Sequence, residues 1–418
     1  MSIKPIQIQV PGSKSITNRI LLLSSFAERK IVIKNIGHCD DTNYMMAGLK
    51  KLKTRSFQDK PAHLFTGNAG TATRFLTALS TLMERTITID GDKRMRERPI
   101  SELTNALNNL GAKITSKNGF LPITIHPQKL RGGKIKLKGN ISSQYLSALL
   151  MTTPFATENT TIEIEHKLCS IPYVEMTLEL LKQLGIKIVN KNFEQFEITG
   201  NQRIISPRIL TIESDASSAS YLGAYAALHP NTPILLGNIR QKSLQGDIKF
   251  LDYLKKMGCE VTSQNTGTKI QGPKTLTSLG EIDMNKTPDL VMTFAILAMF
   301  VENPTKITNI GNLRIKETDR IQALKNEISK LGIEVKTGED FIEIHGNPKL
   351  LIPNLKPKTQ PKSPLSIETY NDHRIAMSFA ITQDLLPFLK IKNRNCVSKS
   401  YTRFWNDLKK LQAHGKRK

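Results

Sequence analysis

The sequence predicts a soluble α/β protein of two similar domains, and three observations support this prediction. The chain has 418 residues, which exceeds what a single hydrophobic core usually supports. Its composition, with 39% hydrophobic and 23% charged residues, is that of an ordinary globular protein. Helix-like segments of two kinds alternate along the chain, with short strand-like runs between them.

The first kind of segment is apolar on nearly all sides, and a helix without a polar face must be surrounded by protein. Six segments are of this kind: Arg19–Leu23, Arg74–Leu79, Tyr145–Leu150, Tyr221–Leu228, Leu290–Phe300 and Arg374–Ile381. They recur at intervals of roughly 55 to 85 residues, which indicates a repeat.

The second kind is amphipathic and often ends at a glycine, which suits the left-handed position after a helix. Its members are Leu103–Gly111, Val174–Gly185, Phe250–Gly258, Ile321–Gly332, Met45–Leu52 and Phe404–Leu411. Alternating runs such as 31–33, 86–89 and 161–164 predict strands, and the Pro- and Lys-rich stretch 353–364 predicts a surface loop. Six repeats of a buried helix, an amphipathic helix and short strands predict two domains of three repeats each.

The net charge of +24 is the unusual property of the composition. A nucleic-acid partner, an anionic substrate or a lysine-rich surface would each produce it. An anion site needs only a few cations, whereas many lysines lie in patterns such as 49–52 and 408–411, on the outer faces of predicted amphipathic helices. We therefore interpret most of the charge as surface, and a basic nucleic-acid-binding protein remains the alternative from another class.

Cysteine spacing and hydropathy argue against several other classes. The four cysteines are Cys39, Cys169, Cys259 and Cys396. Because they form no CxxC pair, we expect reduced thiols and neither a zinc site nor a disulfide framework. The longest apolar run, 290–301, is too short to span a bilayer. We expect a cytoplasmic protein without a secretory leader.

Polar and basic residues gather where the buried helices begin. The phrases are Ser13-Lys14-Ser15, Asn68-Ala69-Gly70-Thr71, Ser142-Ser143-Gln144, Asp215-Ala216-Ser217-Ser218, Pro288-Asp289 and Asn371-Asp372-His373-Arg374. Helix N-termini are natural anion sites, although an N-cap is the simpler explanation for any single Ser, Asn or Asp. Lys14, Arg74 and Arg374 oppose the helix dipole unless an anion lies nearby, so they favour ligand binding.

Eight phrases follow one another along the chain: Pro11–Arg19, Gly67–Arg74, Arg94–Ile100, Ser142–Leu146, Asp215–Ala219, Lys316–Arg320, Thr369–Arg374 and Cys396–Lys399. Each phrase alone is weak evidence. In this order they resemble the motifs of the 5-enolpyruvylshikimate-3-phosphate synthase family, the 3-phosphoshikimate 1-carboxyvinyltransferases. The resemblance runs from about Pro11 to Lys399, nearly the whole chain.

The resemblance implies two similar domains that close over a cleft, each built of three βαβαββ units with the buried helices inside, an inside-out α/β barrel. The chain would cross between the domains near Lys14 and near Asp215. One domain would then comprise residues 1–13 with 216–418, and the other residues 14–215. We expect a monomer with no membrane partner and no specific nucleic-acid partner.

The activity implied is transfer of the carboxyvinyl group of phosphoenolpyruvate to the 5-hydroxyl of shikimate-3-phosphate, with release of phosphate. This is a step of chorismate and aromatic amino-acid biosynthesis in the shikimate pathway. It requires no metal and no other cofactor. The nearest alternative is the sister transferase that acts on a UDP-linked amino sugar, but that enzyme typically lacks the Lys-Ser-x-x-Asn-Arg and Lys-Glu-Thr-Asp-Arg phrases.

The resemblance also assigns residues to the two anionic substrates. By motif match, phosphoenolpyruvate contacts Lys14, Asn68, Gly70, Arg98, Gln144, Arg320, Arg374 and Lys399. Shikimate-3-phosphate contacts Lys14, Ser15, Arg19, Ser142, Ser143, Gln144, Ser170, Asp289, Asn312 and Lys316. The catalytic residues are Asp289 on the hydroxyl side, Glu317 on the substrate carbon, and Lys14. Taken alone, Glu317 and Arg320 could instead form a simple i, i+3 ion pair on a helix surface.

The resemblance adds an expectation at Gly70, and two positions, Phe75 and Ile171, depart from the family's usual pattern. Glyphosate competes with phosphoenolpyruvate in this family, and tolerant members often carry alanine where this chain has Gly70, so we expect a sensitive enzyme. Phe75 stands where proline is frequent, which predicts altered packing behind Thr71. Ile171 stands where a basic residue is common, which predicts a weaker phosphate contact there.

Overall fold

The computed structural model describes residues 4–53, 60–205, 207–351 and 364–415. The chain divides into two compact units: unit 1 comprises residues 1–12 and 213–418, and unit 2 comprises residues 13–212. The boundaries expected from the sequence, after residues 13 and 215, differ from these by one and three residues. The surface loop expected at 353–364 lies, except for its last residue, outside the described residues.

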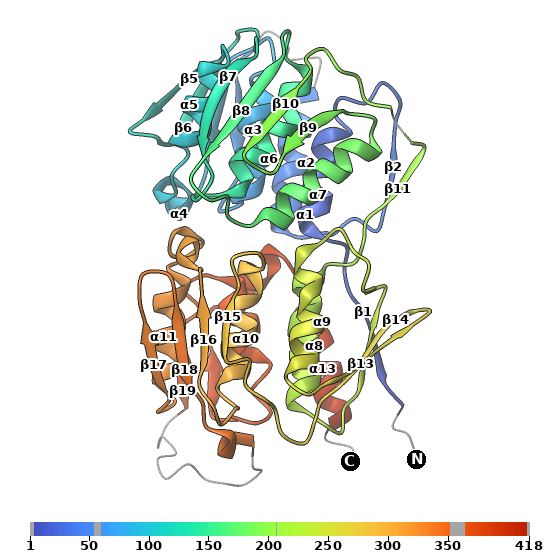
Figure 1. The fold of residues 1–418 in the computed structure, drawn as a ribbon, viewed down its shortest axis with the longest axis vertical. Helices are drawn as coiled ribbons and strands as arrows, with labels where there is room; N and C mark the ends of the chain where they lie inside the picture. The colour runs from blue at the N-terminus through green and yellow to red at the C-terminus, as the bar shows by residue number, and fades with distance from the viewer. Residues whose placement is uncertain (1–3, 54–59, 206, 352–363, 416–418) are drawn as a thin grey trace. The chain divides into compact units, whose positions relative to one another are not determined.

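Unit 2 contains two complete βαβαββ repeats (Figure 1). The first consists of β3 (Ala62–Phe65), α3 (Gly70–Ser80), β4 (Ile87–Asp90), α5 (Ser101–Asn109), β5 (Lys113–Lys117) and β6 (Phe120–His126), with the short α4 (Lys93–Glu97) after β4. The second consists of β7 (Gly133–Lys138), α6 (Ser143–Thr152), β8 (Thr160–Glu165), α7 (Ile171–Gln183), β9 (Ile188–Lys191) and β10 (Gln195–Ile198). Their sheets have the matching orders β3-β4-β6-β5 and β7-β8-β10-β9.

The third repeat of unit 2 is shorter. It contains α1 (Lys14–Leu23), β2 (Val32–Lys34), α2 (Asp40–Lys53) and β11 (Ile209–Thr211). Strands β11 and β2 pair in parallel, although they come from opposite ends of the segment that forms this unit. Within the described residues this repeat therefore has two strands instead of four.

Unit 1 repeats the same plan. Its complete repeats are β1 (Ile6–Gln9), α8 (Ala216–Leu228), β12 (Ile234–Gly237), α9 (Phe250–Lys256), β13 (Glu260–Gln264) and β14 (Gly267–Gln271), then β15 (Glu281–Asp283), α10 (Val291–Ala298), β16 (Thr305–Thr308), α11 (Arg320–Ser329), β17 (Glu334–Thr337) and β18 (Ile342–His345). The short repeat is β19 (Leu365–Ile367), α12 (His373–Ala380), β20 (Leu389–Ile391) and α13 (Phe404–Gly415). Here too the two strands of the short repeat, β19 and β20, are parallel.

The first strand of the chain belongs to unit 1, whose other elements all follow unit 2 in the sequence. Strand β1 pairs in parallel with β12, from Ile6 opposite Ile234 to Gln9 opposite Gly237. Ile8 and the following Val10 are buried in the core of unit 1, 2% and 0% exposed. Two distant parts of the sequence therefore share one sheet and one core.

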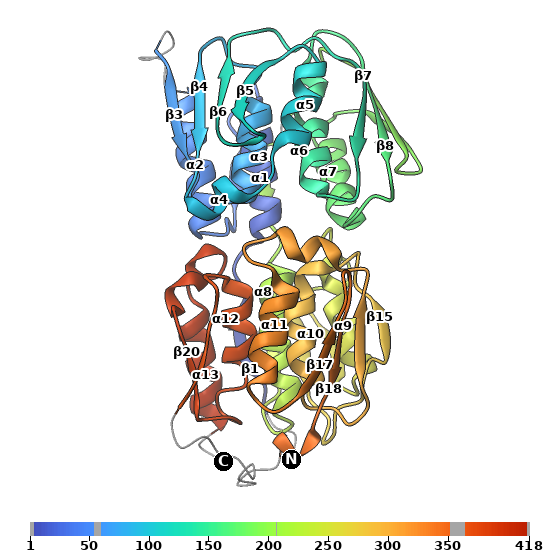
Figure 2. The same ribbon diagram turned by 90° about the vertical axis from the view of Figure 1, so that its left-hand side faces the viewer.

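The six helices predicted to be buried are confirmed. In unit 2, α3 packs against α1 and α6, and in unit 1, α10 packs against α8 and α12. Figures 1 and 2 show the sheets on the outside of each unit and these helices within it. The glycines predicted to follow the amphipathic helices have φ of +99° at Gly111, +79° at Gly185, +96° at Gly258 and +75° at Gly332.

The two-domain α/β fold is as predicted, with the third repeat of each unit shortened. The repeat in the sequence consists of helices, and both helices of each short repeat are present. A pattern of helices does not show how many strands accompany them. The sequence therefore did not predict that each short repeat has two strands instead of four. Across the described residues, no helix combines the length and hydropathy needed to cross a membrane.

Candidate functional site

In unit 2, the beginnings of α3 and α6 lie together. The side chain of Gln144, in the first turn of α6, accepts a hydrogen bond from Arg74 Nη1 at 2.6 Å. Its amide nitrogen donates to Thr71 Oγ1 at 3.2 Å. The Arg74 guanidinium also lies 5.2 Å from the ring centre of Tyr145. Arg74 thus orients Gln144, although the motif match assigned no ligand to this arginine.

Gly70, the first residue of α3, lies beside two buried arginines. A Cβ atom built on Gly70 would lie 2.7 Å from Nη1 of Arg74 and 2.7 Å from Nη1 of Arg98. Arg98 also donates to Asn68 Oδ1 at 3.4 Å. The structure therefore brings together Asn68, Gly70, Arg98 and Gln144, four of the residues predicted to contact phosphoenolpyruvate.

Lys14, the first residue of α1, has a carboxylate partner that the sequence analysis missed. Its Nζ lies 3.0 Å from Asp41 Oδ2, in the first turn of α2. Asp41 is 2% exposed. Because a buried carboxylate needs a cation nearby, Asp41 holds the Lys14 ammonium group near the start of α2.

Arg19 is committed to protein acceptors. Its Nε donates to Thr177 Oγ1 at 2.8 Å, and its Nη2 donates to Ser147 Oγ at 3.2 Å and to the Tyr173 carbonyl at 3.1 Å. Its Nη1 donates to the Ser15 carbonyl at 3.1 Å. Burial lowers the pKa of Arg19 to about 10, so the group stays charged near neutral pH.

Phe75 forms part of the same packing. The Arg19 guanidinium lies 5.2 Å from the centre of its ring, a cation–π distance. Phe75 is fully buried. The Phe75 ring therefore packs against the arginine that joins α1 to α6 and α7.

The serines predicted to bind shikimate-3-phosphate lie at helix starts. Ser142 caps α6 and accepts a hydrogen bond from the Gln144 backbone at 3.3 Å, and Ser143 begins that helix. Ser170 precedes α7 in a left-handed conformation with φ of +54°, and Ile171 begins α7. The N-cap alternative is confirmed at Ser13, Ser142, Asp215 and Asp372, whose side chains accept from the first turn of their helices.

In unit 1, Arg320 is the centre of a buried cluster of charges. This first residue of α11 is 1% exposed and donates to three carboxylates. The shortest contacts are 2.7 Å to Asp372, 2.9 Å to Glu317 and 3.3 Å to Asp289. Burial alone would lower the pKa of Arg320, but the three carboxylates raise it above its ordinary value.

Arg374 also donates hydrogen bonds to two of these carboxylates, those of Asp289 and Asp372. Its Nη2 donates to Asp289 Oδ2 at 2.6 Å and its Nη1 to the Tyr221 hydroxyl at 3.1 Å. Its backbone N–H donates to Asp372 Oδ1 at 2.8 Å. Burial raises the pKa of Tyr221 to about 12, so this hydroxyl keeps its proton near neutral pH.

Lys399 completes the cation set, with its Nζ 3.8 Å from Glu317 Oε1. The Glu317–Arg320 ion pair expected as the simpler alternative is present, but it is buried, with side-chain exposures of 10% and 1%. It is therefore not a helix-surface pair. Asn312 and Lys316 lie on and directly after η5 (Gly311–Ile315), in the chain segment that leads to Glu317.

Three residues of this cluster were not assigned as site residues from the sequence. Asp372 and Tyr221 lie in or beside the motif phrases, one as the N-cap of α12 and the other one turn into α8. Asp247 lies outside every phrase, in η3 (Gly246–Lys249), and nothing in the local sequence marks it. It is 2% exposed, and its carboxylate accepts a hydrogen bond from the Ser217 hydroxyl.

The described parts of the chain contain no group of three His, Cys, Asp or Glu that could hold a metal ion. All four cysteines are buried free thiols, and burial raises the pKa of Cys259 to about 12. The clusters of both units combine arginines and lysines, which bind anions, with carboxylates, which accept and donate protons.

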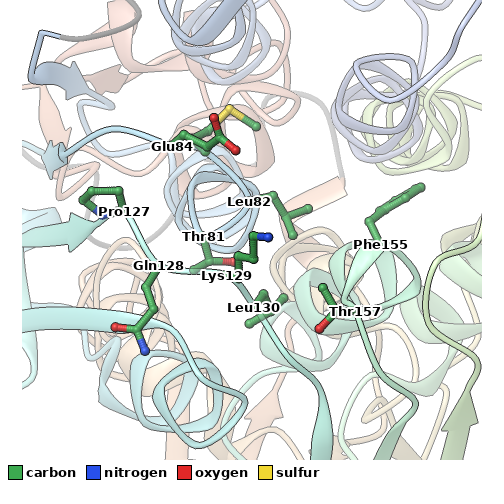
Figure 3. A pocket seen from close by; sticks show the side chains of 10 residues that line it. Thr81, Leu82, Glu84, Pro127, Gln128, Lys129, Leu130, Phe155 and Thr157 are labelled. Atoms are coloured by element: carbon green, nitrogen blue, oxygen red, sulfur yellow. The ribbon is translucent and has the colours of Figure 1, made fainter.

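A pocket of about 430 Å³ lies elsewhere in unit 2. Its lining comes from residues 81–84, residues 127–130, Phe155 and Thr157 (Figure 3). Thr81 directly follows α3, whose first residue is Gly70, so this pocket lies at the opposite end of that helix. None of the predicted site residues lines it.

The comparison with known families decides the relationship of the chain. The sequence model of EPSP synthase (3-phosphoshikimate 1-carboxyvinyltransferase) matches residues 5–408. The chain belongs to the EPSP synthase family. Among its relatives, a 3-phosphoshikimate 1-carboxyvinyltransferase of Hamiltonella defensa is 41% identical, over 97% of this chain and 96% of that protein. One from Shewanella baltica is 38% identical, over 97% of each chain.

Solved structures of the EPSP synthase family share the fold. EPSP synthase from Acinetobacter baumannii superposes with a TM-score of 0.73 at 23% identity, over 98% of this chain and 96% of that one. Membership of the EPSP synthase family favours neither the UDP-amino-sugar transferase nor the nucleic-acid-binding alternative.

Proposed function

We propose that the protein transfers the carboxyvinyl group of phosphoenolpyruvate to the 5-hydroxyl of shikimate-3-phosphate and releases phosphate. The observation that carries the proposal is a buried pair of arginines, Arg320 and Arg374, grouped with Asp289 and Glu317 in a chain of the EPSP synthase family. We propose that it acts as a cytoplasmic monomer without a metal or other cofactor.

Phosphoenolpyruvate carries a carboxylate and a phosphate, and arginine binds both through two parallel hydrogen bonds. We assign its binding to Arg320, Arg374 and Lys399 of unit 1. From unit 2 we assign Lys14, Asn68, Gly70, Arg98 and Gln144. The cations of unit 1 already pair with carboxylates, at 2.6 Å for Arg374 with Asp289. An incoming anion would therefore exchange with a carboxylate partner of the protein, which leaves Asp289 available to accept a proton.

For shikimate-3-phosphate we assign Ser15, Arg19, Ser142, Ser143, Gln144 and Ser170 of unit 2, with Lys14, and Asp289, Asn312 and Lys316 of unit 1. Arg19 donates to four protein acceptors, including the Ser15 carbonyl at 3.1 Å. Its first contribution is therefore to hold the start of α1 against α6 and α7. A direct contact between Arg19 and the substrate stays a prediction.

The addition step needs two proton transfers. As the 5-hydroxyl oxygen bonds to C2 of phosphoenolpyruvate, Asp289 accepts the hydroxyl proton and Glu317 gives a proton to the methylene carbon. In the elimination the proton movements reverse: the tetrahedral intermediate loses phosphate from C2, the phosphate takes the proton held by Asp289, and the methyl group returns a proton to Glu317 to form the enol ether. Cations near the departing phosphate stabilise the charge that develops on it.

The decisive experiment is the choice of acceptor. Purified protein is mixed with phosphoenolpyruvate and either shikimate-3-phosphate or the UDP-linked amino sugar, and phosphate release is measured. We expect release only with shikimate-3-phosphate. Turnover with the UDP-sugar and none with shikimate-3-phosphate would overturn the proposal.

A further inference from the structure

The side-chain amide of Gln144 lies between two neighbours that differ in what they allow. Its oxygen accepts from Arg74 Nη1 at 2.6 Å, and its nitrogen donates to Thr71 Oγ1 at 3.2 Å. A threonine hydroxyl both donates and accepts, so Thr71 is compatible with either end of the amide. A guanidinium group only donates, so the end that faces Arg74 must be the oxygen. Arg74 therefore determines which way the amide points.

Arg74 is itself fixed in place. It is 4% exposed, and its guanidinium group lies 5.2 Å from the ring centre of Tyr145, a cation–π distance. The Tyr145 hydroxyl in turn donates to the Pro99 carbonyl at 2.6 Å, which holds the ring. The start of α6 therefore supplies both the acceptor and the aromatic ring that hold this guanidinium group.

The amide lies in the part of the site that we assign to phosphoenolpyruvate. The same Nη1 atom of Arg74 would lie 2.7 Å from a Cβ atom built on Gly70, and so would Nη1 of Arg98. An amide nitrogen carries two N–H groups, and Thr71 accepts from one of those of Gln144. The second N–H is left for a ligand or for water. If the amide were turned over, it would offer an oxygen there, which repels an anion.

We propose that Arg74 is a positioning residue, which keeps the Gln144 amide turned so that its nitrogen donates to the phosphoenolpyruvate anion. The inference rests on the proposed function, because Gln144 is assigned there to this substrate. Arg74 acts through Gln144 and touches none of the reacting atoms. Without the guanidinium group the amide is free to turn over, because the last torsion angle of a glutamine side chain is broad and roughly two-fold.

The test is a double-mutant cycle, because a cycle separates an effect that passes through Gln144 from a direct one. The proteins are the wild type, Arg74→Met, Gln144→Met and the double variant, since methionine is a long side chain that offers neither amide nor guanidinium group. The KM for phosphoenolpyruvate is measured at saturating shikimate-3-phosphate. We expect Arg74→Met to raise it roughly 10-fold, as for one lost hydrogen bond to a charged group. When residue 144 is methionine, the rise should be less than about 3-fold.

The turnover number and an exposed arginine provide the controls. Because Arg74 orients a binding group, kcat should change less than KM in Arg74→Met. Arg203→Met removes a positive charge from the same unit at a side chain that is 85% exposed, and it should leave KM unchanged. A rise of equal size from Arg74→Met in both Gln144 backgrounds would overturn the inference, as would a KM that Arg74→Met does not change.

A second variant keeps the inference testable if Arg74→Met does not fold. Arg74→Lys keeps a donor for the amide oxygen but loses the planar fork, so we expect a smaller rise in KM, of about 3-fold. This rise should also disappear when residue 144 is methionine. If it were the same in both backgrounds, the effect would not pass through Gln144 and the inference would be wrong.

The cycle can also be measured without turnover. Calorimetry with phosphoenolpyruvate alone gives the dissociation constants of the same proteins, and these should show the same dependence on Gln144. Failure of the proposed function is a separate result: no phosphate release by the wild type with shikimate-3-phosphate, whatever the dissociation constants show.

Discussion

Asp289 and Glu317 share Arg320 as a partner, at 3.3 and 2.9 Å. Asp289→Asn and Glu317→Gln keep the shape of each side chain but remove its ability to accept or carry the proton. We expect each change to lower kcat by roughly 10²-fold or more, as is typical when a general acid or base is removed. Steady-state phosphate release measures this.

Binding should change less than turnover in these two variants, because shikimate-3-phosphate has other contacts. Glu334→Gln is a matched control, since Glu334 is exposed on β17 and lies outside the cluster. Near-normal kcat in both Asp289→Asn and Glu317→Gln would exclude the proposed proton route.

Gly70 has arginine nitrogens, not open space, on the side where a methyl group would point. Gly70→Ala would place Cβ 2.7 Å from Nη1 of Arg74 and of Arg98, closer than real Cβ contacts, so both side chains must shift. We expect a higher KM for phosphoenolpyruvate and a larger rise in the inhibition constant of glyphosate, the longer competitor. Inhibition curves for both proteins measure the ratio. An unmodified enzyme that resists millimolar glyphosate would contradict this account.

Asp247 also gives a prediction for stability. An aspartate ordinarily has a pKa of 3.8, and burial raises the pKa of Asp247 in the folded protein to about 7. The folded state therefore holds this proton more tightly than the unfolded chain does. Below about pH 4 the carboxyl group is protonated in both states, so its ionisation takes nothing from the free energy of unfolding. The loss grows as the pH rises and is complete above about pH 7. Asp247→Asn should therefore raise stability more at pH 8 than at pH 5, by on the order of 2 kcal/mol. Urea unfolding at both pH values tests this, and an equal change at both would contradict it.

At the scale of the element, α11 fixes the segment that carries Asp372 and Arg374. Glu327 of α11 is fully buried and accepts from the Tyr370 hydroxyl at 2.8 Å and from the Glu368 backbone at 3.0 Å. Tyr370 and the next residue, Asn371, have φ of +53° and +56°, a left-handed conformation that costs free energy in non-glycine residues. Glu327 therefore holds a strained turn that ends at Asn371, directly before Asp372 and three residues before Arg374.

Glu327→Ala should lower the free energy of unfolding by roughly 2 kcal/mol, because it removes the buried carboxylate that accepts from Tyr370, the Glu368 backbone and Lys330. The KM for phosphoenolpyruvate should rise more than kcat falls, since Arg374 loses its fixed position. Glu327→Gln keeps an acceptor for Tyr370 and should restore most of the stability. Glu334→Ala, at an exposed site, is the control. Equal losses in the Ala and Gln variants would show that the hydrogen bonds do not matter.

Helices were predictable to within a few residues, and strand number was not. The apolar segment 290–301 and the stop at Gly332 are set by side chains close in sequence, so local patterns report them. The strands of the short repeats have three residues each, so a period of two is hard to read in them: the run 31–33 predicted β2, whereas β19 was not predicted.

The candidate site likewise has residues that the sequence predicted and partners that it did not. Arg320 and Lys14 lie in recognisable motifs, but folding brings their carboxylate partners to them from distant parts of the sequence. Asp41 is 27 residues from Lys14, and Asp372 is 52 residues from Arg320. Asp247 reaches the cluster only because Gln245 and Ser217 fix its segment on α8. No spacing rule within one chain segment predicts such contacts.

At the scale of the whole molecule, the two units differ in the number of chain segments that form them. Unit 2 is one continuous segment, so a fragment of residues 13–212 should unfold cooperatively on its own. A fragment of residues 213–418 lacks β1 and the buried side chains of Ile8 and Val10. We expect its melting to be broad, and to sharpen when a peptide of residues 1–12 is added. Circular dichroism against temperature tests both, and a transition of residues 213–418 equally sharp with and without the peptide would contradict the expectation.

The pairing of Ile6 with Ile234 has a consequence for synthesis on the ribosome. Translation proceeds at about 5 to 20 residues per second, so β1 leaves the tunnel roughly 10 to 45 seconds before its partner strand β12 exists. In that interval all of unit 2 is made and is able to fold. The nascent strand, with Ile6 and Ile8, must stay extended and protected from other chains until β12 arrives. Strand β1 therefore waits until all of unit 2 has been synthesised before it reaches its native partner strand.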